Sequence, residues 1–174
     1  SVELDGIHLH CSGVRRNRNR HRAPSSNHWK SNRFFQSYLA LGNPYDPAMV
    51  FAINCGGSAY NGNNGINYVA DTYFTGGHVD SYPGNAVANT TDDVLYNSAR
   101  SDHSAYHIPV TNGYDTVTLQ LAETYWTAAN ERVFSVSIEG NSVAQNLDLY
   151  TAAPGKWVAY DLNVPVAIAD GSLD

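Results

Sequence analysis

The stretch RVFSVSIEGNSV, residues 132–143, decides the fold. Within it, apolar and polar residues alternate from Val133 to Glu139, and a Gly-Asn pair at 140–141 then turns the chain back. The apolar members of the alternation are Phe134, Val136 and Ile138. Such period-two alternation is typical of a β-strand with one face in a core and the other in water. The stretch therefore predicts a strand, a tight turn and a returning chain.

The same kind of pattern recurs on both sides of this stretch. TVTLQL at residues 116–121 alternates in the same way, and Asn112-Gly113 before it is a strong hairpin signal. Further short strands are expected at Met49–Asn54, Val94–Tyr96, Ala105–Val110, Trp157–Leu162 and Val164–Ile168, and from Leu173 onward. No helical periodicity of useful length is present. Many short strands separated by turn residues predict an all-β sandwich.

Long loops rich in Gly and Asn separate the early strands, as in NGNNG (61–65) and TGGHVDSYPGN (75–85). Loops of this kind usually carry the binding residues of a β-sandwich. Aromatic residues occur in and near them at Tyr60, Tyr68, Tyr73 and Phe74. These rings could line a groove or anchor the loops on the sandwich, and the sequence leaves both interpretations open.

Charge divides the chain into two parts. Residues 1–47 carry seven basic and three acidic side chains, whereas residues 48–174 carry three basic and thirteen acidic ones. The first part is expected to be a short strand, residues 1–10, followed by a linker rich in Arg, Asn and Ser from Val14 onward; the Arg run could instead bind a polyanion. The acidic second part argues against nucleic acid as a partner, because nucleic-acid affinity comes mainly from Lys and Arg. No apolar run approaches the ~18 residues of a membrane span.

Several blocks of the second part resemble the malectin domain family in order and spacing. The blocks are VFAINCGG, GINYVAD, TTDDVLYNSAR, TVTLQLAETYW, RVFSVSIEGNSV and LDLY, and they lie between about Met49 and Asp174. The resemblance implies a jelly-roll-type β-sandwich at residues 48–174 that binds glycans and works outside the cell, at the cell surface or in the secretory pathway. Family members usually continue past a turn such as DGSLD into two further strands, which are expected to be absent here.

The resemblance also carries site residues. The aromatic pair after the alternating strand matches Tyr125 and Trp126, the latter replacing a Phe, and a tyrosine of the long early loop matches Tyr82. Tyr125 and Trp126 lie beyond the alternation, so at least one ring is expected in a loop, with Trp126 alternatively capping the core. Further candidates for sugar contacts are Tyr68, Tyr60, Arg100 and Glu123.

Two departures from the family bear on the sugar. The family tyrosine that follows the arginine of the LYxxxR block falls at Ser101 here, and the acidic residue that closes the family's site would lie beyond Asp174. The sugar class recognised could therefore differ from the glucose disaccharide of the animal type. The Asp92-Asp93 pair of the same block is expected to fix loops through hydrogen bonds.

The sequence supports three hypotheses of function. The first is a non-catalytic module that binds a neutral oligosaccharide or polysaccharide; the second is a structural or adhesion domain of a tandem extracellular array, in contact with neighbouring domains and without its own sugar ligand. A glycosidase using Glu123 and Asp148 is the third and weakest, because thirteen acids make some pair inevitable. No cofactor is expected, although loop carboxylates could hold a structural calcium. Asn89 begins an N-glycosylation sequon, usable only in a eukaryotic secretory setting.

Overall fold

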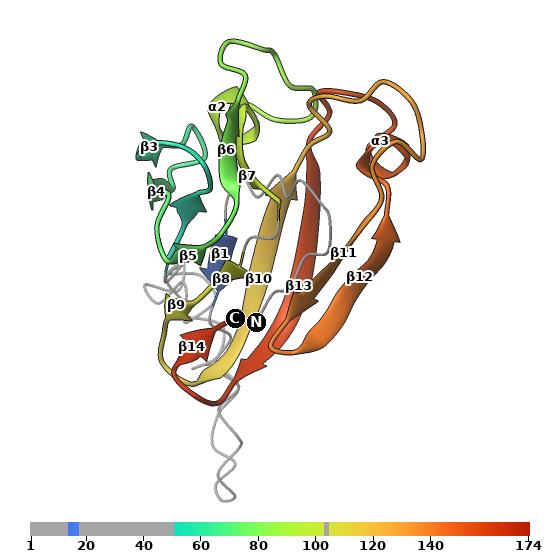
Figure 1. Ribbon diagram of the computed structural model, residues 1–174. Helices are drawn as coiled ribbons and strands as arrows, with labels where there is room; N and C mark the ends of the chain where they lie inside the picture. Colours follow the sequence, from blue (N-terminus) through green and yellow to red (C-terminus); the bar gives the residue numbers. More distant parts are fainter. Residues whose placement is uncertain (1–13, 18–50, 103–104) are drawn as a thin grey trace, which may run out of the picture.

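The computed structural model describes residues 14–17, 51–102 and 105–174, which form a mostly β domain with two single-turn helices (Figure 1). The short strands are β1 Val14–Asn17, β2 Ile53–Asn54, β3 Tyr60–Asn61, β4 Asn67–Ala70, β5 Phe74–Thr75, β6 His78–Ser81, β7 Ser98–Ser101, β8 Ala105–Tyr106, β9 Ile108–Pro109 and β14 Ser172–Leu173. The long strands are β10 Gly113–Leu121, β11 Phe134–Ile138, β12 Asn141–Leu147 and β13 Tyr160–Ile168. The helices are α2 Asp93–Tyr96 and α3 Leu149–Ala152. None of the described helices is long and apolar enough to cross a membrane.

The two nine-residue strands β10 and β13 pair antiparallel along their whole length, from Gly113 opposite Ile168 to Leu121 opposite Tyr160. Strand β1 pairs antiparallel with the other edge of β10, so part of the segment expected to be a linker is a strand. The expected strand at residues 1–10 lies outside the described residues. Strand β13 was expected as two strands, and Pro165 lies in its middle. Proline lacks the backbone donor of a ladder, and β13 accommodates it because β10 is its one partner among the described strands.

Strand β10 has a buried cluster on each face. The large cluster contains Val117, Leu119 and Leu121 together with residues of β2, β8, β9, β11, β13, β14 and α3. The small cluster, on the other side, consists of Ala52, Ile66, Tyr68, Val87, Leu95, Tyr96 and Ala122. The expectation that β10 shows one face to water was therefore wrong for Thr118 and Gln120, which are buried.

Gln120 is accommodated on the buried face by a chain of hydrogen bonds. The Tyr68 hydroxyl donates to its Oε1 at 3.0 Å, and its Nε2 donates to the Tyr96 hydroxyl at 3.2 Å. Tyr96 in turn donates to Asp161 Oδ1 at 2.7 Å. A buried polar group is tolerated when it is hydrogen-bonded in this way, so a polar residue in the alternation did not mean a solvent-facing one.

Two other local expectations were wrong. Val94–Tyr96, expected as a strand, is part of helix α2, whose first residue, Asp93, accepts a 3.0 Å hydrogen bond from the backbone N–H of Val87. Asn112-Gly113 does not close a hairpin, because β9 pairs with β14 while β10 pairs with β1 and β13. The chain changes sheets at this turn instead of folding back on itself.

The hairpin expected around Gly140 is confirmed. Strands β11 and β12 pair antiparallel with Ile138 opposite Asn141, and the two residues between them, Glu139 and Gly140, have φ values of 52° and 70°. Two positive φ values define the turn type whose twist matches that of the flanking strands. In β11 the alternation also holds, since Phe134, Val136 and Ile138 are buried and the residues between them are partly exposed.

Replacing Gly140 by alanine is expected to lower the free energy of unfolding by about 1 kcal/mol, or a few degrees in thermal midpoint. A Cβ at this position would meet no heavy atom within 4 Å, so the cost comes from the left-handed backbone alone. Gly140→Asn is the matched control, because asparagine tolerates this conformation better. Equal losses for both variants, measured by thermal unfolding, would contradict this account.

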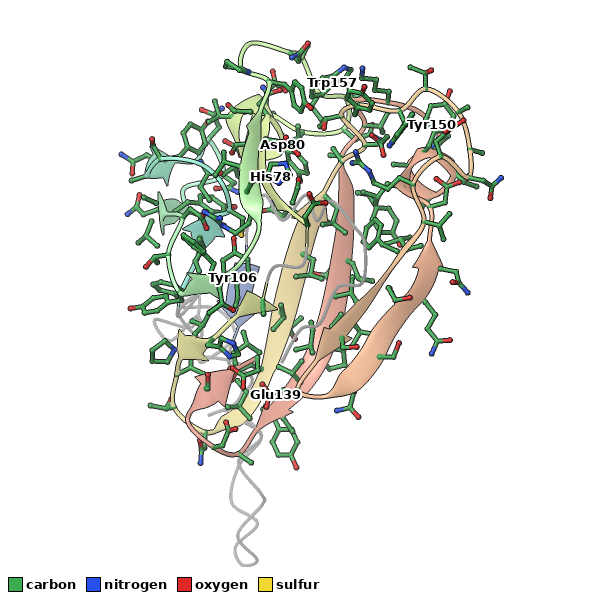
Figure 2. All side chains as sticks on the ribbon, viewed as in Figure 1. His78, Asp80, Tyr106, Glu139, Tyr150 and Trp157 are labelled. Atoms are coloured by element: carbon green, nitrogen blue, oxygen red, sulfur yellow. The ribbon has the colours of Figure 1, made fainter. Side chains whose placement is uncertain are left out.

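Loops gather at one end of the molecule, at the top of Figure 1, where β10 ends and β13 begins. They comprise residues 82–92, 122–133 and 153–159. Figure 2 shows Trp157 at this end and Glu139 at the opposite one. Because strands β10, β11 and β13 all have a terminus here, the rigid pair of long strands sets the positions of the loop side chains.

Candidate functional site

The candidate site begins where β10 ends. After Leu121 the chain stays buried through Thr124 and then emerges, leaving Tyr125 56% exposed and Trp126 partly exposed. The two rings meet edge to face, with centroids 4.9 Å apart and an interplanar angle of 86°. Tyr125 is therefore outside the core. An exposed ring beside a second ring fixed at right angles offers a flat apolar platform.

Glu123 holds this aromatic pair from beneath. Its side chain is 1% exposed, and its Oε1 accepts the backbone N–H of Tyr125 at 2.7 Å and that of Trp126 at 2.8 Å. A carboxylate that accepts two consecutive N–H groups fixes the local turn, since charge-assisted hydrogen bonds are stronger than neutral ones. Glu123 thus supports the rings from within the fold, and its carboxylate is not exposed at the surface.

Arg132, just before β11, is the buried counter-ion of Glu123. Its Nη1 lies 3.3 Å from Glu123 Oε2 without hydrogen-bond geometry, and its Nε and Nη1 are buried without a hydrogen-bond partner. Burial lowers the pKa of the Arg132 guanidinium, while Glu123 and Asp80 counteract that shift. The pair is a buried charge interaction in which each partner depends on the other.

Tyr82 contributes a second ring pair to the same end of the molecule. Its backbone N–H donates to Asn97 O at 2.7 Å, and its ring meets Trp157 edge to face at 6.0 Å and 76°. Burial is the main cause that raises the pKa of Tyr82. The groups near enough to shift this pKa further are Asp80, Arg132, Tyr125 and Glu123. Tyr125 and Glu123 of the first ring pair and its support are therefore among the groups that act on the Tyr82 hydroxyl.

Trp157 belongs to this group, although the sequence indicated only the start of a strand there. Its backbone N–H donates to Glu123 O at 2.8 Å, and Lys156 Nζ lies 5.5 Å from the centroid of its ring. The Pro154-Gly155 pair just before it is a turn signal that could have placed it in a loop. No comparable local signal distinguishes Arg132.

Tyr60 and Tyr68 lie elsewhere, Tyr68 within the small cluster and Tyr60 packed against it. Tyr68 is 2% exposed, and Asn64 Nδ2 donates to its hydroxyl at 3.1 Å. Tyr60 packs on the small cluster and donates through its hydroxyl to Asp92 Oδ1 at 3.1 Å. Asp92 is buried and also accepts the backbone N–H of Asn63 at 2.5 Å, so it fixes loops as expected. The rings of Tyr60 and Tyr68 act as loop anchors in this structure.

Arg100, a further candidate, is buried and fully engaged within the fold. Its Nη2 and Nε lie 2.6 Å and 2.8 Å from Asp71 Oδ2, and its guanidinium stacks 3.3 Å from the centroid of the Phe74 ring. Its Nη1 donates to the carbonyls of Gly76 and Gly77. These contacts hold the loop between β5 and β6 and leave little of the guanidinium for a ligand.

Asp148, the proposed acidic partner of Glu123 in a glycosidase, caps helix α3. Its Oδ1 accepts the N–H of Tyr150 at 3.1 Å, and its Oδ2 accepts the N–H of Asn130 at 2.9 Å and the hydroxyl of Thr151 at 2.6 Å. Burial alone would raise the pKa of Asp148, but these hydrogen bonds outweigh it and lower the pKa. A carboxyl group of lowered pKa is poorly suited to the role of general acid.

The remaining candidates concern modification and metal. Asn89 of the sequon is exposed on a loop, with a φ of 65°, and its glycosylation stays a prediction. Among the residues that the structure describes, no three His, Cys, Asp or Glu side chains gather in a way that could hold a metal ion.

Comparison with known proteins gives the class of this domain. Residues 49–174 match the family model of the malectin domain, and the chain belongs to that family of carbohydrate-binding domains. Malectin-A of Xenopus laevis is 30% identical over 132 residues, covering 72% of this chain and 48% of that protein. Malectin of Homo sapiens is 28% identical over 141 residues, covering 77% and 48%. The chain thus spans about half the length of these relatives.

Solved structures agree on the fold. The ANXUR2 extracellular domain from Arabidopsis thaliana superposes with a TM-score of 0.62 at 18% identity, over 71% of this chain and 42% of that one. A β-glucuronidase of Bacteroides uniformis gives 0.62 at 16% identity, over 70% and 15%. At such identities the likeness shows a shared, mostly β fold alone. The resemblance to the malectin family expected from the sequence is confirmed by the family model.

Proposed function

We propose that this domain binds a neutral oligosaccharide at its loop-bearing end, through Tyr82, Tyr125 and Trp126, and performs no reaction on it. The observation that carries the proposal is the exposed Tyr125–Trp126 pair, fixed edge to face on a buried carboxylate. The C–H-rich face of a pyranose packs well on an exposed ring, and polar groups at the rim then orient its hydroxyls.

The balanced charge beneath the Tyr125–Trp126 pair supports a neutral ligand there. Arg132 is compensated by Glu123, and Asp80 lies near enough to act on the same guanidinium. Tyr60, Tyr68 and Arg100 are left out of the proposed site, because each is engaged with other parts of the fold. The proposal places the protein outside the cell or in the secretory pathway, and it takes the sheets on either side of the large cluster as a jelly-roll-type sandwich.

A glycan array probed with the whole chain tests this proposal. Binding to a defined set of glycans that contain glucose or galactose is expected. Absence of binding to both neutral and acidic glycans would overturn the proposal and favour a structural or adhesion domain that contacts neighbouring domains without a sugar ligand.

No hydrolysis of polysaccharides is expected. Both oxygens of Glu123 are engaged inside the protein, and Asp148 has a lowered pKa as the cap of α3. Incubation with starch, β-glucan and galactan, followed by a reducing-sugar assay, checks this expectation. Reducing sugar that is released by the parent but not by a Glu123→Gln variant would show an enzyme instead.

A further inference from the structure

Two edge-to-face aromatic pairs lie at the loop-bearing end. The first is Tyr125 with Trp126, and the second is Tyr82 with Trp157. They are physically linked, because Trp157 donates its backbone N–H to the carbonyl of Glu123, whose side chain holds the first pair. A single sugar needs one stacking surface, so the second pair calls for its own explanation.

The backbone of Trp157 is held in an unusual conformation. Its φ is 61°, in the left-handed region that bulky residues rarely adopt. The conformation is maintained from both sides, since the Trp157 N–H donates to Glu123 O and the Trp157 carbonyl accepts the N–H of Ala88, each at 2.8 Å. Strain that the surrounding structure enforces is often found at binding sites.

Packing alone does not account for this ring. Trp157 lies against the small cluster but stays partly exposed, as does Tyr82. Lys156 Nζ lies over the ring, 5.5 Å from its centroid, and adds a donor on that side of the indole. A partly exposed ring with a donor beside it has the parts of a sugar-stacking surface.

We propose that Trp157, with Tyr82 and Lys156, forms a second stacking subsite that binds a further pyranose of the glycan held at Tyr125 and Trp126. The subsite rests on the proposed function and deepens it. Its occupant is a neutral glucose- or galactose-containing oligosaccharide longer than a disaccharide. One sugar unit stacks at the first pair and another at Trp157, where the Lys156 ammonium donates to a hydroxyl.

The test is affinity as a function of chain length. Malto-, laminari-, cello- and galacto-oligosaccharides of two to six units are titrated calorimetrically into the parent chain and into Trp157→Gly, Trp157→Ala and Trp157→Phe. A glycine at this position adopts a φ of 61° without strain, so the Trp157→Gly variant removes the ring and preserves the backbone. Tyr114→Ala is the control, because Tyr114 is an exposed aromatic at the far end of β10.

In the parent, we expect at least fivefold tighter binding of the longer members of one series than of its disaccharide. The Trp157→Gly and Trp157→Ala variants should still bind the disaccharide but lose this gain, so that they bind the longer members no more tightly than the disaccharide. Trp157→Phe should keep most of the gain, and Tyr114→Ala should keep all of it. A gain that persists without the ring overturns the subsite, as does disaccharide binding with no gain in the parent. Binding of no series at all would overturn the proposed function and the subsite together.

Tryptophan fluorescence gives a readout that does not depend on variants at position 157. In a chain with Trp29→Phe and Trp126→Phe, Trp157 is the one remaining tryptophan. Its emission is expected to change with the longer oligosaccharides and not with the disaccharide. Unchanged emission at saturating concentrations of a bound longer oligosaccharide would exclude Trp157 from the site.

Discussion

Replacing Glu123 by alanine is expected to lower the free energy of unfolding by about 3 kcal/mol or more. The truncation leaves the buried Arg132 guanidinium without a counter-ion and removes the acceptor of two backbone N–H groups, those of Tyr125 and Trp126. Urea unfolding measures the change. Glu131→Ala is the control, because Glu131 is exposed and lies in the same loop, and surface substitutions of this kind usually stay within about 0.5 kcal/mol.

A double-mutant cycle separates the ion pair from the hydrogen bonds. Glu123→Gln retains an acceptor for the two N–H groups but loses the charge, whereas Arg132→Met removes the cation. Either single change leaves one buried group without its partner, whereas the double change removes both charges. The double variant is therefore expected to lose less stability than the two single variants combined. Additive losses, or a Glu123→Ala variant as stable as Glu131→Ala, would show that the pair does not hold this end of the fold together.

The sequence predicted β11 and its hairpin well because their pattern is local. Alternation in residues 133–139 and the Gly at position 140 determine β11 and its hairpin without reference to the rest of the chain. Val94–Tyr96 was misread because three apolar residues are too few for a period of 2 to be told from one of 3.6. Gln120 was misread because its burial depends on Tyr68 and Tyr96, which are distant in sequence.

For the candidate site, too, residues marked by a local pattern were predicted and residues positioned by tertiary contacts were not. Tyr125 was expected in a loop because it follows the end of an alternation, and its exposure agrees with this. Pro154-Gly155 could have placed Trp157 in a loop, but no local pattern reveals its left-handed backbone, which depends on hydrogen bonds to Glu123 and Ala88.

The few basic residues of the acidic part of the chain indicate specific contacts that the strand and loop patterns do not predict. Residues 48–174 contain only Arg100, Arg132 and Lys156 as cations. In the structure these lie against Asp71, Glu123 and Trp157 respectively. In an acidic domain each rare cation therefore marks a specific contact, and two of the three belong to the candidate site.

Replacing both Tyr125 and Trp126 by alanine is expected to abolish glycan binding. Stacking of a sugar should contribute about 1 kcal/mol per ring, by analogy with aromatic pairs, so losing both weakens binding at least about tenfold. Folding should survive, because neither ring belongs to the large or the small cluster. Calorimetric titration with the oligosaccharide bound most tightly by the parent, together with a thermal midpoint, measures both effects.

The comparison with Glu123 makes this prediction specific. The double aromatic variant should lose glycan binding and keep its thermal midpoint within a few degrees. Glu123→Ala should lose glycan binding and also unfold at a lower temperature, because it removes the support of the rings together with a buried charge pair. Tyr114→Ala, which removes a more exposed ring outside the site, should change neither glycan binding nor the thermal midpoint. If the double variant instead unfolds, or if it binds the sugar as the parent does, the rings are core caps or bystanders and the site lies elsewhere on the domain.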